Sequence, residues 1–316
     1  MANSKKTIAI FGASGFLGSS LVLALSQSNQ NLKLFSRNKE KIKLWTVNPY
    51  VQIFDLDLDN LAQVKKDLKK TDVVINLLGI LHQSKKETFE NIHHIWPDHL
   101  AKVMKDLGIK RLLHVSALGA SSNAPSLYLK SKALGESELF KQKDLNVTIL
   151  RPSIIFGAKD NFINMFRILV KWLPGIVLLS PQSKFQPIFI EDVSKILIKT
   201  LFDKKTYGNI YDLGGPDIYS LKDIIRLIIR SEKLTRLIIP LNRSLSYLFA
   251  LSMEMMPIKI LTRDNWRSMQ VDNVVNPKRA ISYRYSLERL EHYLCNKKNR
   301  PLARSKYDVY RSKSGR

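Results

Sequence analysis

Three side chains in the middle of the sequence have the types and spacing of a proton-transfer group. Ser116 is followed by Tyr128, and Lys132 comes four residues after the tyrosine. Residues four apart lie on one face of a helix, so the phenol and the ammonium would be neighbours. A tyrosine with its usual pKa of about 10 needs such a cation before it can act as a base near neutrality. The alternative is an exposed basic turn.

A glycine-rich turn near the N-terminus has the spacing of a phosphate-binding loop. The segment FGASGFLG follows the apolar run TIAIF and opens an apolar-periodic helix. The first glycine permits a tight turn, the second lets a phosphate approach the backbone, and the third allows close helix–strand packing. The helix N-terminus offers free N–H groups to a pyrophosphate. We predict a dinucleotide site rather than a purely structural turn. Its loop residues are Gly12, Ser14, Gly15, Phe16, Leu17 and Gly18.

The end of the second apolar run bears on which dinucleotide is bound. NAD sites usually have an acidic residue here for the ribose 2′-hydroxyl. This sequence has Ser36 and Arg37 instead, and the planar guanidinium fork matches phosphate oxygens. The sequence therefore favours NADP(H) over NAD(H). The alternative is that Arg37 starts a solvated basic segment with Lys39, Lys41 and Lys43.

Further cofactor contacts are predicted where the next strands end. The segment DLDLD offers a carboxylate to the adenine amino group, and Asp57 is our choice over Asp55 and Asp59. In the alternative interpretation, one of these aspartates is the N-cap of the next helix and does not contact a cofactor. At the end of the fourth strand, Asn76 and Gly79 are predicted to line the nicotinamide-side ribose, and the alternative for Asn76 is an ordinary turn residue. The predicted set comprises Asp57, Leu58, Asn76, Leu78, Gly79, Ser116, Tyr128, Lys132, Pro152 and Ser153.

These residues require strands that alternate with helices. The predicted strands cover 7–11, 32–36, 51–54, 72–79, 111–120 and 147–153. Four helices are predicted between them: one that ends near residue 25, two over 60–69 and 87–107, and one that contains Tyr128. Gly108 is the expected C-cap of the long helix. Such alternation predicts an α/β protein with a Rossmann-like, doubly wound parallel sheet and a smaller mixed α/β C-terminal lobe. Ser116 then ends the fifth strand, at the ligand-binding edge.

The pattern of the sequence changes after Pro152, because the apolar elements become short and are separated by prolines. We predict a dinucleotide-binding domain over 1–153, a smaller lobe over 154–296 with late crossings back to the sheet, and a flexible basic tail over 297–316. Arg151 has two possible roles, at the nicotinamide edge or in a buried ion pair. The residues Gln186, Pro187, Glu191 and Asp192 are expected to hold the lobe junction.

Composition narrows the class of protein. The 316 residues include 51 Lys+Arg against 27 Asp+Glu, a net charge of +24, which favours anionic partners or reflects a compositional habit of the source. No nucleic-acid motif accompanies the charge, so we predict no nucleic-acid partner. Cys295 is the single cysteine, which excludes a disulfide framework, and the six histidines lack metal-ligand spacing. We predict no metal.

Membrane features are limited to possible surface contacts. Because the N-terminal MANSKK runs straight into an apolar strand, we expect no signal peptide, and Arg167, Lys171 and Pro174 interrupt the apolar segment over 162–180. That segment is expected to form a buried or interfacial helix followed by a strand. The apolar helix SLSYLFALSMEMMP over 244–257 is too short to span a bilayer. It is either core, or, over 244–256, a surface for a membrane or a partner. We predict a cytoplasmic, peripheral protein.

Taken together, the glycine turn, NLLG, the serine after the fifth strand and Tyr-x-x-x-Lys resemble the short-chain dehydrogenase/reductase superfamily over nearly the whole chain. Later motifs are similar to those of an atypical group within it. They are SALGA, YLKSKALGE, ILRPSIIFGAKDNFINMF, FQPIFIEDV, YDLGGP and LTRDNWRSMQVDNVV. This group contains the nucleotide-binding accessory subunit of respiratory complex I and its bacterial relatives.

The resemblance implies a subunit that binds NADPH for structure or assembly, without turnover. It also implies complex I subunits as partners, on the cytoplasmic (matrix-equivalent) side of an energy-transducing membrane. Lys132 would contact the nicotinamide ribose. Several members lack the tyrosine–lysine pattern, whereas this chain keeps it with Ser116. The alternative is therefore an active NADPH-dependent reductase or dehydrogenase acting on a quinone-like or sterol-like carbonyl or alcohol. A redox-sensing regulator is a third hypothesis.

Overall fold

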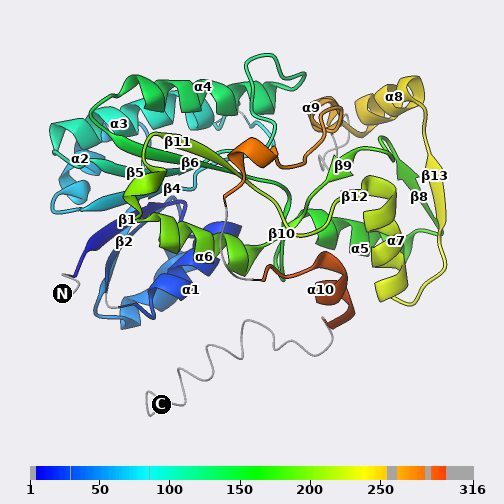
Figure 1. The fold of residues 1–316 in the computed structure, drawn as a ribbon, viewed down its shortest axis with the longest axis horizontal. Coiled ribbons are helices and arrows are strands. Elements are labelled where there is room, and N and C mark those ends of the chain that lie inside the picture. The colour runs from blue at the N-terminus through cyan, green and yellow to red at the C-terminus, as the bar shows by residue number, and fades with distance from the viewer. Residues whose placement is uncertain (1–4, 29, 85, 255–261, 282–285, 297–316) are drawn as a thin grey trace, which may run out of the picture.

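A seven-stranded parallel sheet forms the centre of the computed structural model, which describes residues 5–28, 30–84, 86–254, 262–281 and 286–296. Its strand order is β11-β6-β5-β4-β1-β2-β3 (Figure 1). The strands are β1 (Thr7–Phe11), β2 (Asn31–Ser36), β3 (Val51–Asp55), β4 (Val73–Asn76), β5 (Arg111–Val115), β6 (Asn146–Pro152) and β11 (Asn209–Leu213). The order reverses between β1 and β4, and ligands of such sheets bind at this switch point, outside the carboxyl ends of the strands.

Helices cover both faces of the sheet, which explains why its strands are apolar without alternation. On one face lie α1 (Phe16–Leu25) and α6 (Ile190–Thr200), and on the other α2 (Leu61–Leu68), α3 (Trp96–Asp106) and α4 (Leu127–Lys141) (Figure 1). Strand β1 contributes Ile8 and Ile10 to one core and Ala9 and Phe11 to the other. The predicted fold class is confirmed.

The predicted helix over 87–107 begins differently from the expectation. Residues Glu90–Ile95 form a π-helical turn, η2, before α3 starts. Pro97 has no N–H to donate to the carbonyl of His93, four residues earlier, so the α-helical pattern is interrupted here. A Cβ at Gly135 of α4 would lie 1.9 Å from that carbonyl oxygen, so only glycine lets α4 pack this closely. Gly108, at φ +69°, follows the C-terminal end of α3 as predicted.

The later part of the chain forms a smaller lobe and also returns to the sheet. Strand β11 lies at the sheet edge beside β6, and α6 packs on α1. The remaining elements are β7 (Ile155–Phe156), α5 (Phe162–Trp172), β8 (Gly175–Leu178), β9 (Lys184–Phe185), β10 (Ile188–Phe189), β12 (Tyr219–Ser220), α7 (Leu221–Ser231), β13 (Leu237–Pro240), α8 (Arg243–Glu254), α9 (Arg263–Ser268) and α10 (Leu290–Asn296), with the short turns η1 (Lys39–Val47), η3 (Lys204–Thr206) and η4 (Pro277–Arg279). The predicted helix and strand over 162–180 are α5 and β8.

The predicted apolar helix over 244–257 is α8 as far as Glu254, and its last predicted residues lie outside the described ones. The predicted basic tail over 297–316 also lies outside them. Of the helices in the described ranges, none has the length and apolar character needed to cross a membrane.

Candidate functional site

The glycine turn after β1 is closed by contacts that exclude side chains. Gly12 has φ +82°, and a Cβ at Gly18 would lie 2.1 Å from the Gly12 carbonyl oxygen. The N–H of Gly15 donates to that same oxygen at 3.0 Å. Gly15 is the N-cap of α1, and among the described residues no side chain caps the first amide groups of the helix. The turn therefore offers a backbone cradle that fits a pyrophosphate.

The predicted residues Ser14 and Ser36 meet at the start of the adenosine side. The buried Ser36 hydroxyl donates to Ser14 Oγ at 2.8 Å and accepts from the Asn38 N–H at 3.1 Å. These bonds tie the end of β2 to the glycine turn. Both hydroxyls thus position the loop from which Arg37 extends.

A cavity of about 490 Å³ lies beyond this loop, at the carboxyl ends of β2 and β3. The predicted Arg37, Asp57 and Leu58 line it, and so does Trp96. The Trp96 indole N–H is buried and has no partner among the described residues. An orphaned donor beside apolar walls fits an adenosine moiety.

Local contacts decide one of the open alternatives around this cavity. The Asp57 side chain accepts from the Asp59 N–H at 3.0 Å, whereas Asn60 caps α2 by accepting from the Gln63 N–H at 3.1 Å. The alternative in which one of the aspartates caps the helix is therefore wrong. Arg37 forms an ion pair with Glu87, a residue that the sequence did not single out.

The turn after β4 links the glycine turn to the nicotinamide side. The buried Asn76 amide bonds to His114 Nδ1 at 3.1 Å and accepts from the Leu78 N–H at 3.2 Å, so its side chain shapes this turn. Leu78 is buried behind Gly12. A Cβ at Gly79 would lie 3.1 Å from Lys132 Nζ, so this glycine leaves room for the ammonium group.

Lys132 lies at the end of β5, where Ser116 follows, and Tyr128 stands one helical turn before the lysine. The Ser116 hydroxyl, directly after β5, is buried without a hydrogen-bond partner among the described residues. Lys132 Nζ donates to the carbonyl of Val115, the preceding residue, at 3.3 Å. An orphaned hydroxyl beside a buried ammonium fits a ligand with polar oxygens, such as a nicotinamide ribose or a carbonyl.

Burial shifts both titratable groups of this set toward their neutral forms. It raises the pKa of Tyr128 to about 12, and it lowers the pKa of Lys132 to about 8 against the opposing charge of Glu136. The phenol therefore stays protonated near neutrality. That state suits a hydrogen-bond donor and disfavours a general base.

Two buried histidines, His93 and His114, complete the site, and no sequence motif pointed to them. His93 Nε2 accepts from the Ile80 N–H at 3.0 Å, which leaves the ring proton on Nδ1, 2.9 Å from Ser131 Oγ. Burial and the charge of Lys132 lower the pKa of His93 to about 2 and that of His114 to about 3. Both rings are neutral. No cluster of potential metal ligands occurs among the described residues.

A C-terminal segment closes the nicotinamide side. The Asp264 carboxylate accepts from the N–H groups of Leu127 at 2.7 Å and Tyr128 at 3.1 Å. Asn273 accepts from the Ser153 hydroxyl through its backbone carbonyl at 3.1 Å and donates to the Leu118 carbonyl at 3.3 Å. The hydroxyl of the predicted Ser153 is therefore bonded to this segment. The carbonyl of the neighbouring Pro152 accepts from the Leu118 N–H at 3.0 Å.

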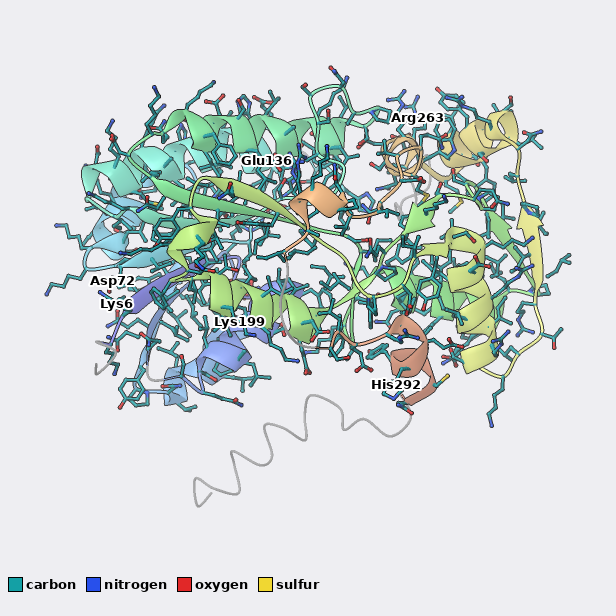
Figure 2. The ribbon with its side chains drawn as sticks, in the orientation of Figure 1. Lys6, Asp72, Glu136, Lys199, Arg263 and His292 are labelled. Atoms are coloured by element: carbon teal, nitrogen blue, oxygen red, sulfur yellow. The ribbon has the colours of Figure 1, made fainter. Side chains whose placement is uncertain are left out.

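Arg151 takes the second of its two predicted roles. Its Nε donates to Glu136 at 2.8 Å, and the guanidinium forms a second bond to the same carboxylate. Both side chains are buried, at 10% and 5% exposure, and Figure 2 places Glu136 on the side of α4 that faces the sheet. The pair joins α4 to β6 and so fixes the helix that presents Tyr128 and Lys132.

Two of the residues predicted at the lobe junction, Gln186 and Asp192, form side-chain hydrogen bonds to distant parts of the chain. Gln186 donates to the Gly215 carbonyl at 2.7 Å and accepts from the Val275 N–H at 3.0 Å. Asp192 accepts from the Glu288 N–H at 2.8 Å. These bonds bring distant parts of the later chain together beside the sheet.

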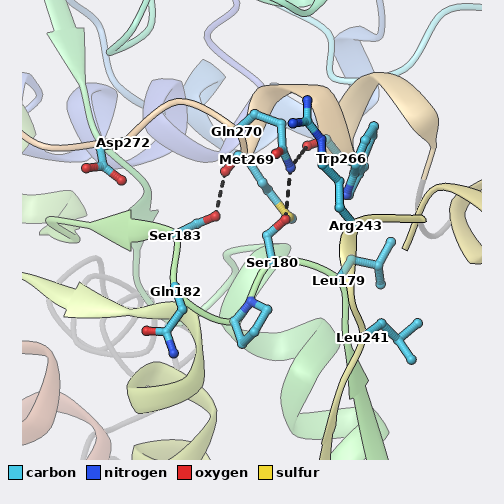
Figure 3. A pocket seen from close by; sticks show the side chains of 11 residues that line it. Leu179, Ser180, Gln182, Ser183, Leu241, Arg243, Trp266, Met269, Gln270 and Asp272 are labelled. Atoms are coloured by element: carbon cyan, nitrogen blue, oxygen red, sulfur yellow. Dashed lines mark hydrogen bonds between the residues drawn. The ribbon is translucent and has the colours of Figure 1, made fainter. Parts of the chain in front are cut away.

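A second cavity, of about 350 Å³, lies in the lobe between the β8–β9 loop, the start of α8 and α9 (Figure 3). Gln270 donates to Ser180 at 3.0 Å, and Ser183 donates to the Met269 carbonyl at 2.5 Å. Dashed lines mark both bonds in Figure 3. None of the predicted site residues lines this cavity, so it is separate from the dinucleotide site.

Comparison with known proteins agrees with this geometry. A family model described as NAD(P)H-binding matches residues 12–162. NADH dehydrogenase (ubiquinone) 1 alpha subcomplex subunit 9, mitochondrial, of Arabidopsis thaliana is 31% identical over 226 residues, covering 69% of this chain and 56% of that protein. Ceramide reductase of Caulobacter vibrioides is 27% identical over 197 residues, covering 62% of this chain and 61% of the reductase.

The match spans less than two thirds of the length of the first subunit-9 relatives. Among solved structures, a nucleoside-diphosphate-sugar epimerase from Staphylococcus aureus is 16% identical, with a TM-score of 0.69 over 92% of this chain and 99% of the epimerase. This likeness shows the fold alone. Residues 12–162 thus form an NAD(P)H-binding domain, and over 69% of its length this chain is similar to the subunit-9 protein of Arabidopsis thaliana.

Proposed function

We propose that the chain is an NADP(H)-binding accessory or assembly subunit of respiratory complex I, without turnover of its own. The sequence match to subunit-9 proteins, over 69% of this chain in the Arabidopsis thaliana relative, is the observation that carries the proposal. The Asp264 carboxylate, which accepts from the Tyr128 N–H, holds the start of α4 in place and supports a structural role. We place the protein on the cytoplasmic (matrix-equivalent) face of an energy-transducing membrane.

The dinucleotide would lie across the switch point of the sheet. The turn Gly12–Gly18 would hold the pyrophosphate, the cavity beside Asp57 the adenosine, and Ser116 with Lys132 the nicotinamide ribose. Arg37 lines the adenosine cavity, where its fork is suited to a 2′-phosphate. This position supports NADP(H) over NAD(H).

The lobe over 154–296 has an exposed apolar face suited to a partner. Trp172 at the end of α5 is 83% exposed and Leu237 of β13 is 66% exposed. The two elements adjoin, since the Leu237 N–H donates to the Pro174 carbonyl at 3.1 Å. On α8, Leu245 and Leu248 are also exposed. Exposed aromatic and aliphatic side chains at one edge are typical of interaction surfaces. We propose that this docking face contacts the complex.

Trp172→Ser combined with Leu237→Ser is expected to reduce recovery of complex I subunits with the tagged chain by about tenfold, because interface anchors of this kind contribute most of the binding energy. Mass spectrometry after detergent purification measures the recovery. Val47→Ser is the matched control, because Val47 is 87% exposed on η1, outside the lobe. Equal recovery from both variants would contradict the proposed docking face. Flotation with anionic vesicles tests the membrane surface as the other occupant.

An active reductase is the second candidate, and the retained Ser116, Tyr128 and Lys132 favour it. Bound NADPH would supply the hydride. The unpartnered Ser116 hydroxyl would orient a quinone-like or sterol-like carbonyl, and the protonated Tyr128 phenol would donate a proton to its oxygen. The resemblance to a ceramide reductase at 27% identity adds support for this alternative.

Tyr128→Phe separates the two candidates. We expect the variant to bind NADPH within about twofold of the wild type and to leave complex I activity unchanged, because the nicotinamide-side contact through Lys132 remains. Loss of a general acid lowers an enzymatic rate by roughly 10²–10⁴. A wild-type chain that oxidises NADPH with a carbonyl substrate, and loses that rate on Tyr128→Phe, would favour the reductase.

A further inference from the structure

The arginine that favours NADP(H) already has an anionic partner. Arg37 follows β2, and its guanidinium is ion-paired with Glu87, which lies fifty residues later, just before η2. Both residues line the 490 Å³ cavity, and their side chains are 44% and 34% exposed. The ion pair therefore lies at the position where a ribose 2′-substituent would meet Arg37.

A 2′-phosphate and the Glu87 carboxylate require the same donors. One edge of the guanidinium fork binds a single carboxylate or phosphate through two parallel N–H groups, and a second anion at that edge is repelled by the first. Binding NADP(H) would therefore displace Glu87 from Arg37. Lys86 lines the cavity as well, whereas Lys39 is paired with Asp55.

The 2′-hydroxyl of NAD(H) does not compete with Glu87, because a hydroxyl can donate a hydrogen bond to a carboxylate. The end of β2 has no carboxylate, and the Ser36 hydroxyl is bonded to Ser14 and Asn38. Glu87 brings a carboxylate to this rim from another part of the chain, where it can accept a hydrogen bond from a ribose hydroxyl without leaving Arg37. It supplies the kind of group that NAD sites have at the end of their second strand.

We infer that Glu87 is a specificity-determining residue, which competes with a 2′-phosphate for Arg37 and accepts the 2′-hydroxyl of NAD(H). The chain binds both dinucleotides, and Glu87 limits the preference for NADP(H) that Arg37 creates. The inference rests on the proposed dinucleotide binding at this site.

Titration of the full chain with NADPH and with NADH tests the inference. Glu87→Gln should tighten NADPH binding by about tenfold, the scale of one charge-assisted contact, and leave NADH binding unchanged or a few-fold weaker. Arg37→Gln should weaken NADPH and spare NADH, and in the double variant the gain from Glu87→Gln should disappear. Glu90→Gln is the matched control, since Glu90 pairs with His94 and does not line the cavity.

The outcomes separate the two levels of the proposal. Equal effects of Glu87→Gln on the two dinucleotides, or no effect on either, would overturn the role of Glu87 and leave dinucleotide binding intact. A gain in NADPH affinity that persists without Arg37 would also overturn the competition. A folded wild-type chain that binds neither dinucleotide would overturn the proposed function itself.

Discussion

Glu136→Leu is expected to lower the free energy of unfolding by about 3–5 kcal/mol, because it leaves the Arg151 guanidinium buried without its counter-charge. Both side chains of this pair are at most 10% exposed, and two hydrogen bonds join them. Chemical denaturation monitored by circular dichroism measures the change. The double variant Glu136→Leu with Arg151→Met should recover much of the loss, since an apolar pair of similar volume leaves no buried charge.

Glu138→Leu on the same helix is the control. Glu138 pairs with Lys141, which is 62% exposed, and with His94 at 3.3 Å, and neither partner is buried as Arg151 is, so this substitution should cost about 1 kcal/mol. A similar loss from both single variants would show that the helix, and not the buried pair, determines the effect. Because α4 also presents Tyr128 and Lys132, the destabilised variant should lose dinucleotide affinity as well.

Gly18→Val is expected to abolish dinucleotide retention. A Cβ at this position would lie 2.1 Å from the Gly12 carbonyl oxygen and 2.9 Å from Ala13, and both contacts are with backbone atoms that cannot rotate away. The turn must open, and its amide groups then no longer converge on a pyrophosphate. We expect affinity for NADPH and NADH to fall at least about a hundredfold, a loss of about 2.7 kcal/mol.

Ala24→Val on the same helix adds a β-branched side chain away from the turn and should keep near-normal affinity. Isothermal titration of both variants, with circular dichroism to confirm folding, makes the comparison. Normal affinity in Gly18→Val would mean that the dinucleotide is held elsewhere.

The fold could be predicted because its determinants are local in sequence. The apolar run TIAIF is β1 with the predicted bounds, and the predicted strands over 32–36 and 51–54 are β2 and β3 within one residue at each end. The predicted strands over 72–79 and 111–120 were too long. They end at Asn76 and Val115, where the chain leaves the sheet to build the site.

The candidate site was predictable only in part, because several of its contacts join residues far apart in the chain. Glu87 meets Arg37 across fifty residues, and Asp264 binds the N–H of Tyr128 across 136. No local spacing relates such residues. The π-helical turn that places His93 beside Tyr128 is set by Pro97 and Gly135, which no helical period reveals.

Purification of the tagged chain from its native membranes tests the central claim most directly. Mass spectrometry of the recovered proteins, together with chromatography of the nucleotide released on denaturation, should find complex I subunits and about one NADP(H) per chain. Glu87→Gln should raise the share of NADP(H) over NAD(H), and Gly18→Val should return chain without nucleotide. Recovery of the folded wild-type chain free of complex I subunits, or free of any dinucleotide, would contradict the account.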